Sequence, residues 1–411
     1  MESKLIIILI IVIGAIAISQ LVRVYELTAK LRKHEEHEIP VRDNYLNAML
    51  MLVFMVIQFG GLIYLMIKYG WTGRGPAASV QGEYTDWLLD LNLILITAIF
   101  FLTNFLLFYF SFKYVKRPGV KAYYYPHNNK LEILWTVVPA AVLAVIIILG
   151  LQTWNEVTGA SPKEAINIEL YSKQFDWTAR YSGTDNMLGK TDYKLILGNN
   201  ELGLMTEATI DSSIHAMRHG AGGILDIQKI LNNRDTVLTD SLVNVLRKDL
   251  GTKERLLRLL NQMKATHNPA LDKQVYDDII QRDTLYLCVN KPYEFSFRSK
   301  DVIHSAYFPH FRAQMNTVPG YGTRLKFTPN MTTAEMRKIK NLPAFHYVLM
   351  CNKICGGAHY KMKMMVVVLE EEEYNAWMKG KESKNFKATY FPAPSAQAVI
   401  PAESTAISAM N

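Results

Sequence analysis

Cysteine is scarce in this chain, which has 3 cysteines among 411 residues. No Cys-x-x-Cys-His occurs, and this excludes a c-type haem attached to the chain. A nucleic-acid-binding face is also missing. Although the formal net charge is +8, the basic residues are dispersed and do not gather with aromatic residues. We therefore expect no nucleic-acid partner.

Long apolar stretches are abundant, and half of the residues are hydrophobic. Four stretches approach or exceed the about 20 residues that a helix needs to cross a bilayer; they span residues 5–22, 47–67, 91–109 and 131–151. Ala15-Ile16-Ala17 imitates a signal-peptidase site, but the first apolar run continues past it. We therefore predict a lipid-embedded chain with two N-terminal helices in residues 1–70 and a transmembrane hairpin in residues 88–152.

Basic residues in the loops predict the orientation of these helices. They concentrate after the first and third apolar stretches, whereas the loop after the second holds only Lys68 and Arg74. Short loops rich in Lys and Arg stay in the cytoplasm. Both termini and everything after residue 151 then lie on the other side. In a bacterium this describes a multi-pass protein of the inner (plasma) membrane whose C-terminal part is periplasmic.

Short strands replace the apolar stretches after residue 151. Segments with alternating apolar residues are separated by Pro, Gly and Asn turns, a pattern typical of an antiparallel β-sandwich or barrel. The predicted strands are residues 166–171, 175–181, 284–289, 293–298, 324–328, 346–351 and 362–369. The tail, residues 388–411, is rich in Ala, Pro and Ser and is predicted to be flexible.

A mainly helical insertion is predicted between the second and third of these strands, at residues 182–282. Apolar residues recur at helical spacing over residues 242–250, with Asp240 as N-cap, and do so again after Gly251-Thr252. His215 and His219 are four residues apart and could face one way on a helix. Because no third ligand is nearby, we interpret them as surface histidines.

One short segment carries the strongest chemical signal of the chain. Cys351 and Cys355 are followed by His359 and Met362, and His304 supplies a second imidazole upstream. Thiolate, imidazole and thioether ligands favour copper over magnesium, calcium or manganese, and zinc sites more often use closer-spaced cysteine pairs without methionine. A structural disulfide or a thiol–disulfide copper chaperone would also use two cysteines, but neither explains the histidine and methionine at ligand spacing.

The second cysteine also bears on the number of copper ions. A mononuclear blue-copper site uses one cysteine, two histidines and a weak methionine. Two bridging sulfurs would let two copper ions share the ligands, with one histidine and one weak axial donor for each. Such a pair can spread one electron over both metals. The residues therefore predict electron transfer rather than substrate binding.

This segment resembles the binuclear copper (CuA) loop of cytochrome c oxidase subunit II. Other pieces, in the family's order, resemble its last membrane helix, an aromatic strand and the strand and turn of the upstream histidine: residues 128–139, 174–177, 301–305 and 308–320. The resemblance covers roughly residues 88–181 and 283–378. It implies a membrane-anchored all-β protein with a cupredoxin-like Greek-key barrel, formed by residues 163–181 and 283–378. The N-terminal helix pair and the helical insertion are additions to the family's pattern.

The resemblance also implies a function. Such a subunit accepts electrons from soluble or membrane-tethered cytochrome c and passes them to a haem in subunit I, where oxygen reduction is coupled to proton pumping. Subunit I and other oxidase subunits are then partners of this chain. A CuA subunit of a nitric oxide reductase and a copper-free quinol oxidase subunit II remain alternatives. The implied ligands of the two copper ions are His304, Cys351, the backbone carbonyl of Lys353, Cys355, His359 and Met362.

Further roles follow from the same resemblance. Trp177 and Phe175 match aromatic residues where electrons enter, although many members carry tryptophan at the position of Phe175. Glu132 resembles a glutamate at the mouth of a proton-uptake channel in subunit I. Lys353 replaces an acidic residue that also holds magnesium in the family. We therefore expect no divalent metal on this side chain, because an ammonium group has no lone pair to offer.

The remaining assignments concern docking and packing. By analogy, Asp176 and Asp301 lie near the copper and contribute to the docking of cytochrome c, which is expected to be electrostatic. The acidic run 370–373 is interpreted as a solvated strand end. Cys288 is predicted to be a small buried hydrophobe. The remaining histidines and methionines of this region are interpreted as structural or packing residues: His310, His346, Met350, Met364 and Met365.

Overall fold

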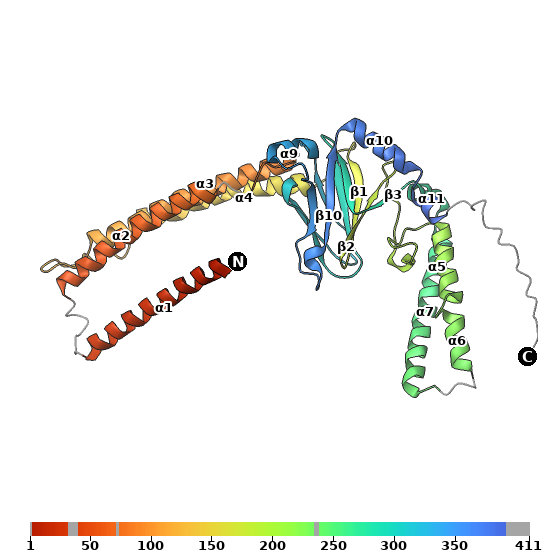
Figure 1. Cartoon of the computed structure of the whole chain (residues 1–411), viewed down its shortest axis with the longest axis horizontal. Helices are drawn as coiled ribbons and strands as arrows, with labels where there is room; N and C mark the ends of the chain where they lie inside the picture. Colours follow the sequence, from red (N-terminus) through yellow and green to blue (C-terminus); the bar gives the residue numbers. More distant parts are fainter. Residues whose placement is uncertain (1, 32–39, 71–73, 234–237, 392–411) are drawn as a thin grey trace, which may run out of the picture. The chain divides into compact units, whose positions relative to one another are not determined.

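The computed structural model describes residues 2–31, 40–70, 74–233 and 238–391 of the chain (Figure 1). The chain divides into two compact units. We call Met1–Arg74 with Leu89–Val145 the helical unit, and Gly75–Leu88 with Ile146–Asn411 the β unit. Each unit is described by itself.

Four helices in the described residues are long and apolar enough to cross a membrane: α1 (Glu2–Leu31), α2 (Val41–Leu65), α3 (Val80–Lys113) and α4 (Asn129–Thr158). They coincide with the four predicted stretches and confirm the transmembrane part of the predicted fold class. Many of their apolar side chains are exposed, as expected where lipid is the solvent. Within the helical unit, α2 packs on α3 through aromatic pairs, with the Phe59 and Phe101 ring centroids 4.6 Å apart.

The β unit contains two five-stranded sheets, with strand orders β3-β2-β1-β5-β8 and β4-β10-β9-β6-β7. The first sheet is formed by β1 (Ile166–Lys173), β2 (Asp176–Tyr181), β3 (Ile279–Arg282), β5 (Tyr293–Ser299) and β8 (Thr323–Phe327). The second is formed by β4 (Thr284–Cys288), β6 (His304–Phe308), β7 (Ala313–Thr317), β9 (Tyr347–Cys351) and β10 (Lys363–Leu369). The predicted β class of this unit, with two sheets, is confirmed.

Pairing within these sheets corrects one part of the prediction. β1 runs parallel to β5, and β4 runs parallel to β10, so both sheets are mixed rather than antiparallel. Alternation of apolar residues identifies a strand but not its neighbour, and these pairs join strands far apart in sequence. Three short strands, β3, β6 and β7, were not predicted from apolar alternation, although the family resemblance implied a strand at His304, which is in β6. β7 reads Ala-Gln-Met-Asn-Thr and shows little of the apolar alternation on which strand prediction depends.

The core of the β unit lies where side chains of the two sheets meet. Phe295 of β5 contacts Phe308 of β6, with ring centroids 5.6 Å apart, and also Phe327 of β8 at 4.8 Å. All three rings are buried. Aromatic contacts of this kind add about 0.5–1.5 kcal/mol each to the burial of the rings. This packing fixes the two sheets against each other and gives the site residues a rigid base.

The insertion between β2 and β3 is helical, as predicted. It contains α5 (Glu207–His219), α6 (Ile224–Asn232), α7 (Asp240–Thr266) and the short α8 (Lys273–Tyr276). Thr239, not Asp240, is the N-cap of α7, because its side chain accepts from the Leu242 amide. A single helix passes through Gly251 without a break. His215 and His219 are exposed on α5, with ring centroids 5.0 Å apart.

Two predictions near the C-terminus need correction. The acidic run 370–373 is exposed and directly follows the end of β10, as predicted, but it opens α10 (Glu371–Glu382), where three glutamates occupy the first turn. Negative charge at a helix N-terminus is favourable because of the helix dipole. The predicted tail begins too early, since α11 (Phe386–Tyr390) is ordered against the β unit and Phe386 is buried. The rest of that tail, residues 392–411, lies outside the described residues.

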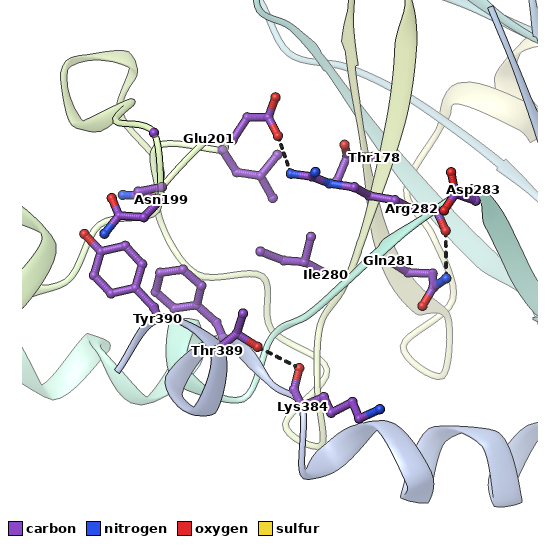
Figure 2. A pocket seen from close by; sticks show the side chains of 14 residues that line it. Thr178, Asn199, Glu201, Ile280, Gln281, Arg282, Asp283, Lys384, Thr389 and Tyr390 are labelled. Carbon is purple, nitrogen blue, oxygen red and sulfur yellow. Dashed lines mark hydrogen bonds and ion pairs between the residues drawn. The ribbon is translucent and has the colours of Figure 1, made fainter. Parts of the chain in front are cut away.

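α11 lines a cleft of about 480 Å³ beside the edge strand β3 (Figure 2). Arg282 donates to Glu201 across this cleft at 2.5 Å. None of the predicted copper ligands lines it. The site that those ligands form is elsewhere in the β unit.

Candidate metal centre

Two neighbouring strands and one loop bring the predicted copper ligands together. His304 begins β6 and Cys351 ends β9, and these strands pair antiparallel with Ala306 opposite Cys351. The chain then turns through Lys353 and Cys355, passes a 3-10 turn, His359–Lys361, and returns as β10. Ligands distant in sequence therefore meet at one end of the second sheet.

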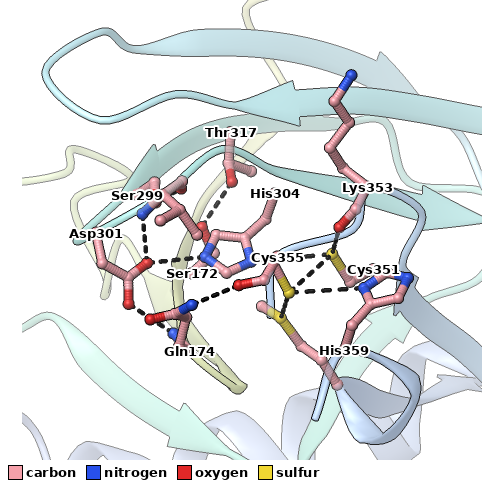
Figure 3. A network of polar contacts seen from close by, with 12 residues as sticks. Ser172, Gln174, Ser299, Asp301, His304, Thr317, Cys351, Lys353, Cys355 and His359 are labelled. Carbon is pink, nitrogen blue, oxygen red and sulfur yellow. Dashed lines mark hydrogen bonds and ion pairs between the residues drawn. The ribbon is translucent and has the colours of Figure 1, made fainter. Parts of the chain in front are cut away.

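Distances within the cluster follow a regular pattern (Figure 3). The Cys351 Sγ lies 3.9 Å from His304 Nδ1 and 3.1 Å from the carbonyl oxygen of Lys353. The Cys355 Sγ lies 3.6 Å from His359 Nδ1 and 3.8 Å from Met362 Sδ. The two sulfurs are 3.9 Å apart. Each sulfur thus has one imidazole nitrogen and one weaker donor beside it.

The two cysteines are free, and their separation is far longer than the about 2.0 Å of a disulfide bond. The donor atoms of His304, Cys351 and Cys355 all lie within 4.8 Å of one another, an arrangement that could hold a metal ion. Most of the cluster is withdrawn from solvent, since His304 is 0% exposed and Met362 1%. The structure therefore brings together all six donors that the sequence predicted.

The chemistry of the donors fits copper. Sulfur and imidazole ligands with a thioether are soft to intermediate donors, which copper accepts and magnesium or calcium do not. Burial, followed by the neighbouring Cys351, raises the pKa of the Cys355 thiol to about 11. Without a metal this thiol holds its proton at neutral pH, and a bound cation would replace the proton. The cysteine pair is therefore suited to a cation and unsuited to reaction as an exposed thiolate.

Asp301 holds His304 in the orientation that a ligand needs. Its Oδ1 accepts from His304 Nε2 at 2.9 Å, and its Oδ2 accepts from the backbone N–H of Gln174 at 2.7 Å. The pKa of Asp301 is lowered: burial opposes ionisation, but hydrogen bonds from Gln174 and His304 outweigh it. With its Nε2 proton directed at a carboxylate, His304 presents the Nδ1 lone pair towards Cys351. The predicted docking residue Asp301 is thus engaged in positioning a ligand.

Gln174 and Phe175 close one side of the ligand loop. The Gln174 side-chain amide donates to the Cys355 carbonyl, next to Gly356 (Figure 3). Gly356 has a φ of +141°, and a Cβ there would come within 2.9 Å of both Gln174 Nε2 and the Phe175 ring. Glycine is therefore required both by the backbone and by this close approach. Sequence reasoning missed this contact of Gln174, although the residue directly precedes the aromatic pair.

The two predicted electron-transfer residues differ in accessibility. The side chain of Trp177 is wholly buried, and its ring centroid lies 6.3 Å from that of His304. Phe175 is only partly buried. Asp176, between them, is also partly exposed and accepts from the Trp177 amide at 2.8 Å. Phe175 is therefore the member of the pair that can contact another protein.

Other candidate residues lie outside the cluster. Glu132 belongs to the helical unit, in the first turn of α4, and accepts from the Asn128 amide at 3.2 Å. Cys288 is buried in β4, as predicted for a small hydrophobe. His310 packs against Phe345, with ring centroids 5.1 Å apart. The methionines that were predicted to pack differ in burial: Met364 is buried, whereas Met365 is 45% exposed.

Comparisons with known proteins point to one family. Residues 71–153 match the family model described as cytochrome c oxidase subunit II, transmembrane domain. The chain is 25% identical, over 80% of its length and 90% of the relative, to an alternative cytochrome c oxidase subunit 2 of Bradyrhizobium diazoefficiens. It is 23% identical, over 75% of its length and 80% of the relative, to cytochrome c oxidase subunit 2 of Cereibacter sphaeroides.

One solved structure that aligns with this chain is the periplasmic domain of subunit II of cytochrome oxidase from Bradyrhizobium japonicum. The alignment covers 55% of this chain and 99% of the periplasmic domain, at 15% identity and a TM-score of 0.27. So low a score decides nothing about the fold. The resemblance rests on the transmembrane match and on relatives that align along most of both chains. This chain is therefore similar to cytochrome c oxidase subunit II, in its transmembrane region and along most of its length.

Proposed function

We propose that this subunit accepts single electrons from cytochrome c at a binuclear copper centre and passes them to a haem in subunit I, where oxygen reduction is coupled to proton pumping. One observation carries the proposal: two free cysteine sulfurs, 3.9 Å apart, each have an imidazole nitrogen and one weaker donor close by. Two similar ligand halves suit two ions better than one. Bound there, a copper pair supplies one-electron transfer with little rearrangement of its ligands.

The protein residues in this proposal have distinct tasks. Cys351 and Cys355 would supply thiolates to the copper ions, and His304 and His359 would each supply an imidazole nitrogen. Asp301 keeps His304 in the required tautomer. The buried surroundings of the cluster exclude water and hold the ligands in one geometry. A copper-free scaffold would have no use for such a convergence of soft donors, and this disfavours the quinol oxidase alternative.

Electrons would arrive at the side of the cluster that Phe175 covers. Its partly exposed ring lies against the backbone of Gly356, next to the ligand Cys355. Trp177 lies behind it, beside His304, and is too buried to touch a donor protein. Asp176 is the nearby carboxylate left for electrostatic docking of soluble or membrane-tethered cytochrome c, since Asp301 is engaged with His304.

The remaining parts of the proposal concern the assembly. The chain would lie in a bacterial inner membrane beside subunit I and other oxidase subunits, with the copper centre on the periplasmic side. Glu132, in the first turn of α4, would stand at the mouth of a proton-uptake channel of subunit I. Oxygen chemistry would occur in that partner.

Copper stoichiometry and electron paramagnetic resonance of the purified full chain test the proposal. We expect two copper ions per chain and the spectrum of one unpaired electron shared by both nuclei. A single copper per chain with a four-line pattern would show a mononuclear site. A chain that binds no copper at neutral pH would support the scaffold alternative instead.

A further inference from the structure

A second polar site lies in the β unit, separate from the metal centre. It is a pocket of about 590 Å³, whose lining includes Trp154 and Thr158 of α4 and the cations Arg180, Lys190, Arg298 and Arg324. We propose that this pocket binds the phosphate group of an anionic phospholipid of the membrane in which α4 is embedded. The inference is independent of copper and goes beyond the proposed electron transfer.

Cations outnumber acids in the pocket. Among the described residues that line it, Glu169 is the acidic one. Glu169 already serves two of the cations: its Oε2 lies 2.6 Å from Arg180 Nε, and Arg298 pairs with its Oε1. Lys190 and Arg324 are exposed and form no ion pair within the part of the chain that the structure describes. An excess of positive charge therefore faces the pocket and lacks a protein partner.

The floor of this pocket is fixed rather than adaptable. The side chains of Arg180 and Glu169 are each 3% exposed, and Arg180 Nη1 also donates to the Gly189 carbonyl at 2.9 Å. Arg298 lies over the ring of Tyr171, 5.1 Å from its centroid, and donates to the Leu202 carbonyl at 3.0 Å. Because these groups are held in place, the two free cations cannot be neutralised by a local rearrangement of the floor.

Hydroxyl groups complete the lining. Thr191 and Ser296 contribute hydroxyl groups to the same pocket, whereas the hydroxyl of the lining residue Thr323 already donates to the Asn316 carbonyl. Guanidinium, ammonium and hydroxyl donors around one hollow match the several acceptor oxygens of a phosphate group. A carboxylate ligand would use fewer of these donors. The shared chemistry is therefore that of a phosphate.

The location of the pocket favours a lipid over a free phosphate ion. Trp154 and Thr158 belong to the final turns of an apolar helix that can span a membrane. Trp154 is 55% exposed, and tryptophan is enriched at the membrane–water interface. Lys326 of β8 donates to the Ala160 carbonyl at 2.7 Å, which ties the chain just after α4 to the strand that carries Arg324. The pocket thus lies where α4 leaves the apolar phase, at headgroup depth.

Lipid titration of the full chain by native mass spectrometry, in a mild uncharged detergent, tests the proposal. The probes are phosphatidylglycerol, phosphatidylcholine and inorganic phosphate. The test variant carries Lys190→Gln with Arg324→Gln. The matched control carries Lys248→Gln with Arg255→Gln, two exposed cations of α7 outside the pocket. Melting temperature and copper content are measured for each protein, and neither should change, because the substituted side chains are exposed and remote from the copper ligands.

We expect the wild-type chain and the control to retain phosphatidylglycerol in preference to phosphatidylcholine. We expect the test variant to bind phosphatidylglycerol about tenfold more weakly. Equal losses in test and control variants would mean unspecific charge attraction and would overturn the proposal. Inorganic phosphate that competes at the affinity of the lipid would overturn the lipid assignment in favour of a soluble anion. Failure of copper loading would leave the result unaffected, because none of the substituted residues is a proposed ligand.

Discussion

The candidate metal centre and the basic pocket of the β unit share one feature, a carboxylate that orients neighbouring polar groups, but they suit ligands of opposite charge. Each uses a carboxylate to hold other polar groups in place: the exposed Asp301 behind His304, and the buried Glu169 behind Arg180 and Arg298. At the candidate metal centre the oriented imidazole presents a lone pair towards the cysteine sulfurs, where a cation is proposed to bind. In the basic pocket the oriented guanidinium groups present N–H donors, where an anion is proposed to bind. A carboxylate organises both sites. The group that it holds, an imidazole in one site and guanidinium groups in the other, decides whether the site suits a cation or an anion.

Removing a sulfur should produce the largest effect and break the metal centre outright. Cys351→Ser or Cys355→Ser replaces a bridging soft donor with a hydroxyl, and we expect loss of the binuclear copper signal in both variants. Cys288→Ser is the matched control, because Cys288 is also buried but lies in β4 away from the ligands. The measurement is copper content together with electron paramagnetic resonance. Retention of two coupled copper ions in either ligand variant would contradict the proposed bridging.

The carboxylate behind His304 can be tested separately from the ligands. Asp301→Asn keeps the size of the side chain but removes the charge that accepts from His304 Nε2. We expect copper affinity to fall by about 10–100-fold, measured by competition with a chelator. Asp176→Asn is the control: its carboxylate accepts from the Trp177 amide and touches no ligand, so copper affinity should stay unchanged. Equal effects in the two variants would remove Asp301 from the positioning role.

The two sites also differ in how far sequence could predict them. Four of the metal-centre side chains lie between Cys351 and Met362, and His304 follows an aspartate at a recognisable spacing. The clustering of these side chains was therefore predictable, and the proposed sixth donor, the carbonyl of Lys353, followed from a family resemblance. The contact by which Asp301 sets the tautomer of His304 was not predictable, because an exposed aspartate near a metal site is equally well interpreted as a docking residue.

The basic pocket left no signal in the sequence. Glu169, Arg180 and Arg298 come from three different strands, and β1 lies between β2 and β5 only because of a parallel pairing. Single charged residues in strands are normally interpreted as a solvated face. Sheet order decides which of them meet, and periodicity carries no information about sheet order. The strands were largely predictable, but their neighbours and the pocket between them were not.

The pH dependence of stability can test the basic pocket separately, through the protonation of Asp278, the second carboxylate that contacts Arg180. Asp278 accepts from Arg180 Nη1 at 2.9 Å and is fully buried; burial raises the pKa of Asp278 to about 8, although Arg180 opposes this. Between about pH 4 and pH 8 the folded chain then holds a proton that the unfolded chain releases. The free energy of unfolding should therefore fall as pH rises through this window, by up to about 1.4 kcal/mol per pH unit, and level off above it.

Asp278→Asn should remove this pH dependence, because an amide does not titrate. We expect the melting temperatures of the wild-type chain and the variant to converge or cross as pH rises from 5 to 8, as followed by intrinsic fluorescence. Asp240→Asn, an exposed substitution in the first turn of α7, should leave the slope of the wild-type chain unchanged. A constant difference between Asp278→Asn and the wild type at every pH would show that Asp278 does not exchange a proton in this range.

The smallest effect on copper binding is expected at Lys353. A substitution there distinguishes the role of its backbone carbonyl from that of its side chain. The carbonyl oxygen of Lys353 lies 3.1 Å from Cys351 Sγ, whereas its ammonium group points away from the cluster (Figure 3). Lys353→Met removes the charge and keeps the carbonyl, so copper stoichiometry and affinity should stay within about twofold of the wild type. Lys190→Met makes the same chemical change in the basic pocket, where the side chain itself is proposed to bind, and should weaken phosphatidylglycerol retention. If Lys353→Met instead lost copper, the ammonium group would be part of the metal centre, and the backbone role assigned to this residue would be wrong.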